Sequence, residues 1–197
     1  MLMIATGYIN KFKSIVIFLI ILLLFESNIP AFSSEKGIES LKEGKKLVFI
    51  RHSLAPGNGD PDNFDINDCS TQRNLNHQGI NQSKKIGFFF KKNKIKIEKV
   101  LSSEWCRCKD TASYAFQKYE TFNALNSFYS EKFYKNKNWQ IKELKNYINN
   151  WNGKKNIIFI THFVVISELL NIGVSSGEII VVDKNLNIIE RIKTLNN

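Results

Sequence analysis

The sequence predicts an α/β protein, with a largely parallel central sheet in a three-layer α/β/α sandwich. Two observations carry this prediction. Short apolar runs of strand length, rich in β-branched residues, occur at 46–50, 100–103, 156–160 and 178–182. Segments with helical spacing of apolar residues lie between them, and this alternation is typical of a parallel sheet buried under helices. The chain has 197 residues, 43% of them hydrophobic, so we expect one domain with a sizeable core.

The elements of the first half follow from this periodicity and from turn residues. A short amphipathic helix is expected before Gly44, and a polar loop rich in Pro and Gly follows the first strand. The expected order is helix 37–43, strand 46–50, loop 55–61, helix 76–92, strand 100–103 and helix 104–116.

The second half continues the alternation after an aromatic, irregular stretch. Residues 120–138 have no clear period, and we expect their rings to pack in the core and in a lid. The expected order is then helix 139–151, strand 156–160, helix 164–171 and a hairpin of strands 178–182 and 187–192.

Residues 1–33 are expected to be a targeting segment, separate from the folded domain 34–197. Lys11 and Lys13 precede an apolar run over residues 15–25, and small residues Ala31 and Ser33 follow it. This pattern is typical of a signal peptide, with an uncleaved N-terminal anchor as the alternative. The run is too short to span a membrane comfortably, so we expect no span in the mature form. Either interpretation places the domain outside the cytoplasm, in the periplasm or otherwise exported.

The net charge of +10 comes from 28 Lys and Arg against 18 Asp and Glu. Only four of the 28 are Arg, and the excess of Lys with abundant Asn and Ile resembles compositional drift. Arg has a planar five-donor fork that suits phosphate and carboxylate, so its positions are more informative. The composition excludes a disordered, collagen-like or multi-span membrane protein as the class of the whole chain. The four Arg residues are Arg51, Arg73, Arg107 and Arg191.

Charged residues follow three of the expected strands. Arg51 and His52 follow the first, Arg107 lies near a helix start after the second, and His162 follows the third. Ligands of parallel α/β sheets bind outside the carboxyl ends of the strands, so these side chains are expected to converge there. Two Arg and two His suit a phosphoryl group, and a helix N-terminus adds backbone donors.

Four segments in this order resemble the histidine phosphatase superfamily, whose fold is phosphoglycerate mutase-like. Residues 47–52 resemble its Arg-His motif, and residues 103–112 resemble its Ser-x-x-x-Arg-x-x-x-Thr segment. Residues 158–162 resemble its second-His strand end. Leu75 with Gly79 and Gln82 resembles a helix entry that lies between the first two motifs. The resemblance covers residues 46–182, with Ser53 standing where the family most often has Gly.

The resemblance implies a role for each matching residue. His52 would attack phosphorus, while Arg51, Arg107 and His162 would hold and neutralise the phosphoryl group. The proton donor is open, because the sequence offers two candidate acids. Glu131 lies 24 residues beyond Arg107, and Asp60 lies in a Pro-Gly-Asn-Gly-Asp-Pro loop that resembles a loop of exported members.

Five residues lie outside these roles: one histidine, one arginine and the three cysteines. His77 is expected on the surface. Arg73 either orients the loop under the pocket or pairs with an acid. The three cysteines are Cys69, Cys106 and Cys108, and Cys69 could pair with either of the others, or all could be buried thiols. A zinc site is not expected, because the paired ligand spacing is absent.

The sequence therefore predicts an exported, metal-independent phosphomonoesterase that works through a phosphohistidine on His52. No cofactor and no nucleic-acid partner is expected, and the substrate is a small phosphorylated molecule. The alternative is a phosphate-binding protein of the same fold in the cell envelope, with little or no catalysis. A basic module that binds anionic surfaces ranks below both, because it rests on the charge alone.

Overall fold

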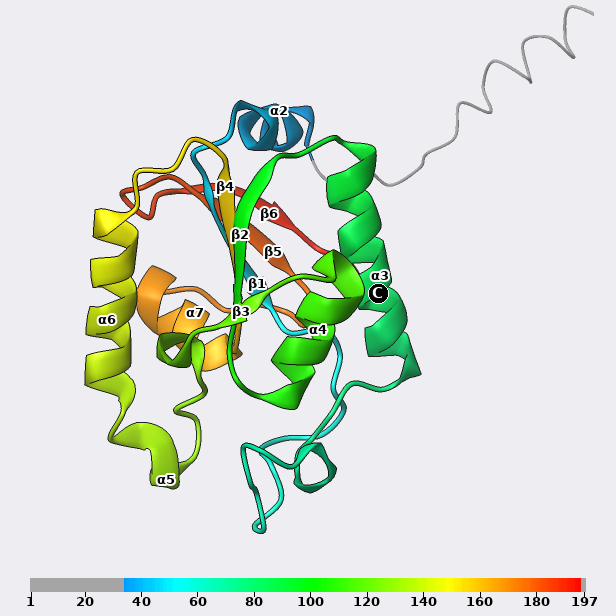
Figure 1. The fold of residues 1–197 in the computed structure, drawn as a ribbon, viewed down its shortest axis with the longest axis vertical. Helices are drawn as coiled ribbons and strands as arrows, with labels where there is room; N and C mark the ends of the chain where they lie inside the picture. The colour runs from blue at the N-terminus through cyan, green and yellow to red at the C-terminus, as the bar shows by residue number, and fades with distance from the viewer. Residues whose placement is uncertain (1–33, 196–197) are drawn as a thin grey trace, which may run out of the picture. The chain divides into compact units, whose positions relative to one another are not determined.

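The computed structural model describes residues 34–195, and within them six strands form one sheet (Figure 1). The strand order is β3-β2-β4-β1-β5-β6, with β3, β2, β4 and β1 paired in parallel. The last two strands pair antiparallel to their neighbours, so the sheet is mixed and mostly parallel. The strands are β1 (Leu47–Arg51), β2 (Ile97–Ser102), β3 (Glu120–Thr121), β4 (Asn156–Thr161), β5 (Ile179–Val182) and β6 (Ile188–Ile192).

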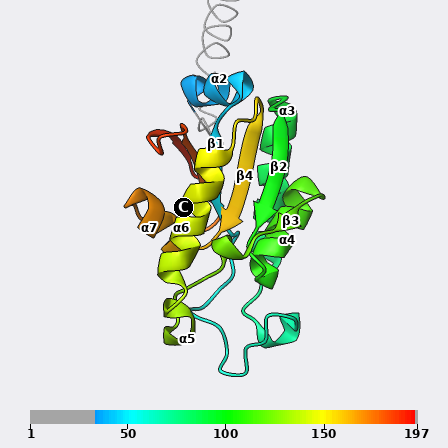
Figure 2. The same ribbon diagram turned by 60° about the vertical axis from the view of Figure 1, so that its left-hand side comes forward.

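Helices cover both faces of this sheet, and Figure 2 shows the layers with the strands between them. One face carries α3 and α4, with α2 at the end of the sheet opposite α4's N-terminus, and the other face carries α6 and α7. The helices are α2 (Glu35–Glu43), α3 (His77–Lys92), α4 (Cys106–Phe116), α5 (Glu131–Tyr134), α6 (Lys137–Asn150) and α7 (Phe163–Leu170), with single 3-10 turns at Cys69–Thr71 and Asn123–Leu125.

The position of β1 in the middle of the sheet explains why its first four residues are all apolar. Alternate side chains of a strand point to opposite faces. Val48 and Ile50 lie in the core under α3 and α4, whereas Leu47 and Phe49 lie in the core under α6 and α7. All four are fully buried, because helices cover both faces. The predicted three-layer sandwich is therefore confirmed.

The predicted elements are all present, and their ends differ from the predicted ones by at most three residues. The irregular stretch 120–138 contains more order than its sequence indicated: the two-residue strand β3, a 3-10 turn and the short helix α5. The side chains of this stretch lie partly in the core and partly on the surface: Phe128 is buried, whereas Tyr129 and Tyr134 are exposed. Elements of two to four residues are too short to show a period, which explains why the sequence did not reveal them.

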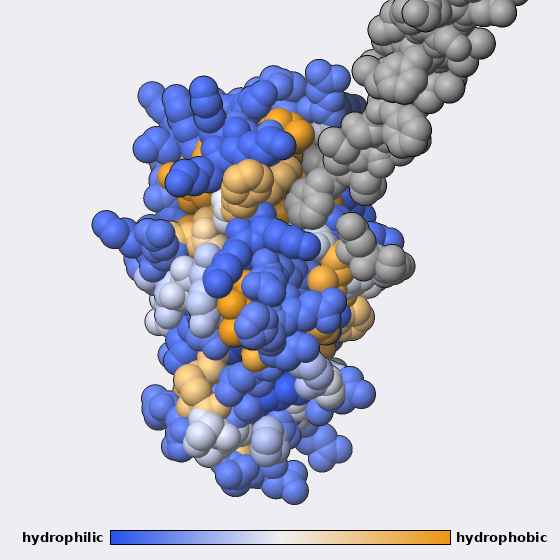
Figure 3. Space-filling model, turned by 90° about the vertical axis from the view of Figure 1, so that its right-hand side faces the viewer, coloured by the Kyte–Doolittle hydropathy of each residue, from blue (hydrophilic) through white to orange (hydrophobic). Residues whose placement is uncertain are grey.

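Lysines lie mainly on the solvent side of the helices. On α3, Lys84, Lys85, Lys91 and Lys92 are exposed, while the opposite side of the helix packs on the sheet. The face over α3 is accordingly mostly hydrophilic, with apolar residues in small separate areas (Figure 3). None of the helices in residues 34–195 is long and apolar enough to cross a membrane. The targeting segment predicted at 1–33 lies outside the described residues.

Candidate active site

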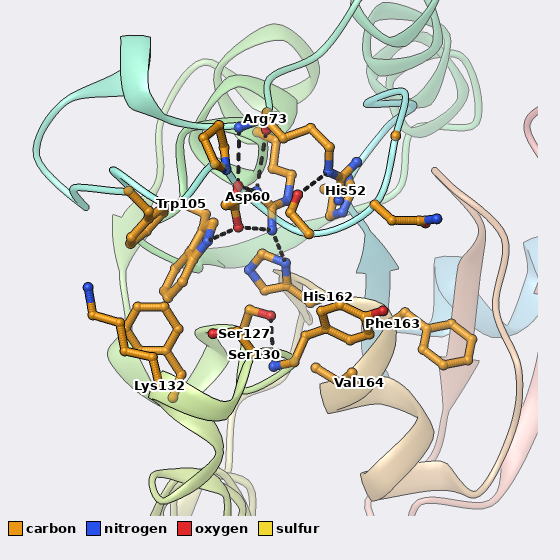
Figure 4. Close-up of a pocket in the computed structure, with 18 of the residues that line it drawn as sticks. His52, Asp60, Arg73, Trp105, Ser127, Ser130, Lys132, His162, Phe163 and Val164 are labelled. Atoms are coloured by element: carbon orange, nitrogen blue, oxygen red, sulfur yellow. Dashed lines mark hydrogen bonds and ion pairs between the residues drawn. The ribbon is translucent and has the colours of Figure 1, made fainter.

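The carboxyl ends of β1 and β4 bring the two predicted histidines together. These strands are parallel neighbours in register, with Arg51 opposite Thr161, and the backbone N–H of His52 donates to the Thr161 carbonyl at 2.9 Å. The residue after each strand is a histidine, so the His52 and His162 rings meet edge to face with centroids 5.5 Å apart. Both rings line a cavity of about 560 Å³ (Figure 4). Arg51 and Arg107 line the same cavity.

His52 is held as a neutral imidazole. Its side chain is buried, and Nδ1 lies 2.8 Å from the Ser53 carbonyl oxygen. A carbonyl only accepts, so Nδ1 carries the proton and donates it, which leaves the lone pair on Nε2. Burial, followed by the charge of Arg107, lowers the pKa of His52 well below its usual value. The ring is therefore ready to act as a nucleophile at neutral pH.

His162 is oriented by a chain of hydrogen bonds from the end of β2. Ser103 Oγ donates to Asn126 Oδ1 at 3.1 Å and lies 2.9 Å from His162 Nε2. A hydroxyl has one proton to give, so Ser103 accepts from His162 Nε2–H, and Nδ1 carries the lone pair. Arg107 Nη2 lies 3.5 Å from that Nδ1. Burial, then Arg107, lowers the pKa of His162 well below its usual value.

Arg51 and Arg73 have different tasks at this edge. Arg51 donates through Nη1 to the Val174 carbonyl at 2.8 Å and lies over the Phe163 ring, while its buried Nε has no hydrogen-bond partner among residues 34–195. Arg73 spans the loop after β1, donating to the carbonyls of Gly59 and Ala55. Of the two roles weighed for Arg73, the structure shows the loop-orienting one for its side chain.

Arg107 forms a largely buried ion pair with Asp60. Its Nη1 donates to Asp60 Oδ1 at 2.6 Å and its Nη2 to Oδ2 at 3.2 Å. Trp105 Nε1 and the Arg73 backbone N–H complete the carboxylate's partners, at 3.0 and 3.1 Å. Burial acts to raise the pKa of Asp60, but Arg107 and these donors outweigh it, so the pKa lies below its usual value. Asp60 is thus ionised and fully hydrogen-bonded.

A disulfide fastens the Asp60 loop to α4, the helix that carries Arg107. Cys69 is bonded to Cys106, the first residue of that helix, with a Cα–Cα distance of 5.7 Å. Gln72 Oε1 accepts from the Cys106 backbone N–H at 2.9 Å and adds a second link. Cys108 is a buried free thiol, whose pKa burial raises to about 12. Of the pairings left open by the sequence, the structure selects Cys69 with Cys106.

The helix entry at α3 supports the backbone that follows His52. Gly79 lies against the Leu54 carbonyl, where any side chain would collide with it. Gln82 Oε1 accepts from the Leu54 N–H at 2.9 Å, and its Nε2 donates to the Ser176 carbonyl and to Thr194 Oγ1, both at 2.7 Å. These two motif residues therefore position the loop that follows His52, and neither lines the cavity. His77, at the start of α3, is exposed.

The outer wall of the cavity is aromatic. Phe64, Trp105 and Phe133 pack together with ring centroids 5.1 to 5.5 Å apart. Phe133 belongs to α5, which also carries Glu131, the second candidate acid. Glu131 lines the cavity with an exposed side chain and makes no hydrogen bond or ion pair within residues 34–195. The structure thus places Asp60 against Arg107 and Glu131 at the mouth.

Two site residues were missed in the sequence. Trp105 donates to Asp60, and Asn126 accepts from Ser103, which orients His162. Neither residue type indicates phosphate chemistry by itself, and Asn126 lies in the stretch without a period. Asn126 directly follows the 3-10 turn Asn123–Leu125, which packs beside β4 and brings its side chain to Ser103. Within residues 34–195 no three His, Cys, Asp or Glu side chains gather around a potential metal position.

Solved structures of phosphatases share this architecture. The protein histidine phosphatase SixA, in complex with tungstate, aligns with a TM-score of 0.56 at 17% identity, over 76% of this chain and 97% of its own. A SixA protein of Agrobacterium tumefaciens, assigned as a phosphohistidine phosphatase, gives 0.54 at 15% identity over 76% and 98%. A phosphoserine phosphatase variant of Entamoeba histolytica, in complex with phosphoserine, gives 0.50 at 15% over 69% and 89%.

These similarities establish the fold: the chain has the fold of the histidine phosphatase superfamily, as its four motifs predicted. No protein-family model and no curated protein sequence matches the chain. At sequence identities of 15–17%, these similarities support a conclusion about the architecture and none about the activity. The chemistry of this protein therefore has to be argued from its own residues.

Proposed function

We propose that this protein is a phosphomonoesterase that hydrolyses a small phosphate ester through a phosphohistidine on His52. One observation carries the proposal: a buried, neutral His52, with its lone pair on Nε2, lies among guanidinium groups at the carboxyl edge of the sheet. A neutral imidazole attacks phosphorus, and Arg51 and Arg107 offer fork-shaped cations for the oxygens of the phosphoryl group. Such a transfer needs mainly positioning and charge stabilisation.

The reaction has two steps in this site. In the first, His52 Nε2 bonds to phosphorus, the ester P–O bond breaks, and an acid protonates the departing oxygen. In the second, that residue takes a proton from water, whose oxygen attacks phosphorus and breaks the N–P bond, releasing phosphate. Arg51, Arg107 and His162 neutralise the phosphoryl oxygens throughout. Asp60 and Glu131 are the two candidate acids.

The decisive experiment traps the covalent intermediate. The protein is mixed with ³²P-labelled substrate and quenched in alkali and in acid, since phosphohistidine survives alkali and is lost in acid. We expect alkali-stable label on the wild type and none on His52→Ala. His77→Ala is the matched control, because this third histidine is exposed at the start of α3. Turnover and labelling retained in His52→Ala would refute the mechanism.

Substrates with different leaving groups distinguish the two candidate acids, Asp60 and Glu131. p-Nitrophenolate leaves without a proton, whereas an alkoxide does not, so loss of the true proton donor affects an alkyl phosphate more. We expect the ratio of kcat/KM for p-nitrophenyl phosphate over glycerol phosphate to rise at least tenfold in the variant that lacks the donor. Asp60→Asn and Glu131→Gln are compared side by side, and an unchanged ratio in both would exclude both residues.

A second candidate function is phosphate binding without turnover. The observation that favours it is the ion pair with Asp60, which occupies both terminal nitrogens of Arg107 and keeps the carboxyl ionised. This candidate predicts that inorganic phosphate raises the melting temperature while every phosphate ester stays intact. Measurable hydrolysis that depends on His52 would rule it out.

We further propose that the protein works outside the cytoplasm. The Cys69–Cys106 disulfide supports this location, because such bonds persist in oxidising compartments. The expected targeting segment over residues 1–33 supports it independently. Fractionation of cells expressing the full chain, with the N-terminal residue of the recovered protein identified by mass, tests both. Recovery of reduced, full-length protein in the cytoplasm would contradict the proposal.

A further inference from the structure

The side chain expected to bind the phosphoryl group already holds an anion. Arg107 is 3% exposed, and both of its terminal nitrogens point at the Asp60 carboxylate, at 2.6 and 3.2 Å. This two-pronged arrangement is the one a guanidinium makes with two phosphate oxygens. Its buried Nε has no hydrogen-bond partner among residues 34–195. The Arg73 carbonyl and His162 Nδ1 lie farther from the terminal nitrogens, at 3.3 and 3.5 Å, so Asp60 is the one anion that this fork binds among the described residues.

The loop that presents Asp60 is built for that position. Gly57 and Gly59 have φ values of 91° and 65°, a region that favours glycine, and these turns bring Asp60 back toward the sheet. Arg73 clamps the same loop at Gly59 and Ala55, and its own backbone N–H donates to Asp60 Oδ1. Trp105 Nε1 holds the other carboxylate oxygen. The contact is therefore fixed from three sides.

The charge balance explains what Asp60 does in the free protein. Arg51, Arg73 and Arg107 repel one another across a half-buried pocket, while the two histidines are neutral. One carboxylate among three guanidiniums offsets this repulsion. A phosphate dianion brought to Arg107 would do the same, but two anions cannot share one fork, because like charges at contact distance disfavour each other.

We infer that Asp60 occupies the phosphate subsite of the free protein, and that the phosphoryl group of a ligand displaces it from Arg107. The inference rests on the proposed function only in its ligand class, a tetrahedral oxyanion such as a phosphate monoester. Displacement frees both terminal nitrogens of Arg107 for two oxygens of the phosphoryl group. Asp60 thereby sets the affinity of the site for phosphate, in addition to any role in proton transfer.

The test measures binding of inorganic phosphate and does not need turnover. Asp60→Asn removes the competing charge and keeps the size of the side chain. We expect isothermal titration calorimetry at pH 7 to give a phosphate dissociation constant at least tenfold lower than that of the wild type. Asp62→Asn is the matched control, because Asp62 is an exposed acid of the same loop without a hydrogen bond or ion pair in residues 34–195. It should change the constant by less than twofold.

A second variant guards against misfolding of the first. Trp105→Phe removes one donor to Asp60 and keeps a ring against Phe64 and Phe133, so phosphate should bind two- to fivefold more tightly. Unchanged or weaker phosphate binding in a folded Asp60→Asn protein would overturn the inference, as would equal gains in Asp60→Asn and Asp62→Asn. Phosphate binding by none of the proteins would overturn it too. Failure of the proposed function shows separately, as tight phosphate binding without hydrolysis.

Discussion

Removal of the Cys69–Cys106 disulfide should destabilise the fold by about 4 kcal/mol. The bond closes a loop of 37 residues. In the chain-entropy model, the entropy removed from the unfolded chain is about 2.1 + 1.5R ln 37, or about 13 cal/mol/K, which gives this value at 25 °C. It is a large fraction of the usual stability of a domain. For a domain of this size we expect the melting temperature to fall by about 8–15 °C.

The assay is thermal unfolding of the double variant Cys69→Ser/Cys106→Ser, followed by circular dichroism. A reductant supplies the matched control, because it should lower the melting temperature of the wild type to that of the variant and leave the variant unchanged. Melting temperatures within 2 °C of each other for variant and oxidised wild type would refute the reasoning. Such a result would mean that the unfolded chain keeps this loop closed without the bond.

The same variant tests how firmly the Asp60 loop is held. Arg73 and Gln72 still link this loop to its own turns and to Cys106. We therefore expect the folded variant to keep kcat/KM within tenfold of the wild type at 25 °C. A loss above a hundredfold in a protein that is still folded would show that the disulfide itself sets the position of Arg107.

Three further predictions follow from the site. His52 and His162 have lowered pKa values in the folded protein, so below pH 6.5 only the unfolded chain takes up a proton at these residues. The free energy of unfolding, measured with urea, should therefore fall as the pH decreases from 7 to 5. The fall should reach up to about 1.4 kcal/mol per pH unit for each histidine. His52→Gln should make this slope shallower. Ser103→Ala removes the acceptor that orients His162, and kcat/KM should fall about tenfold without loss of alkali-stable label. Phe133→Ala opens the aromatic wall, and kcat/KM should fall about tenfold for p-nitrophenyl phosphate but less than twofold for glycerol phosphate.

The sequence predicted the layers and the edge of the sheet where the site lies, because both depend on local patterns. The apolar residues of β1, its last residue Arg51 and the following His52 are contiguous in the chain. The pairing of Asp60 with Arg107 spans 47 residues and depends on turns at Gly57 and Gly59. Tertiary packing decides the direction of these turns and the pairing of Cys69 with Cys106. The spacing of residues along the chain does not determine that packing.

The positions of the Arg and Lys side chains distinguish the residues of the pocket from the general basic charge of the surface. Three of the four Arg line the pocket, which has Lys132 as its one lysine among the described residues. The fourth, Arg191, donates to the buried Glu178 carboxylate and to the Gly173 carbonyl, both in the segment between α7 and β5.

The same segment accepts hydrogen bonds from Arg51. The Val174 carbonyl accepts from Arg51 Nη1, and the Glu178 carbonyl accepts from the Arg51 backbone N–H at 3.3 Å. Arg191→Lys would keep the charge but lose the fork that spans Glu178 and Gly173. If the pocket depends on this support, Arg191→Lys weakens phosphate binding although residue 191 never contacts the ligand, whereas a lysine variant of an exposed α3 position does not. The basic excess of this chain thus divides by residue type: lysine keeps the surface hydrated, and arginine shapes the site.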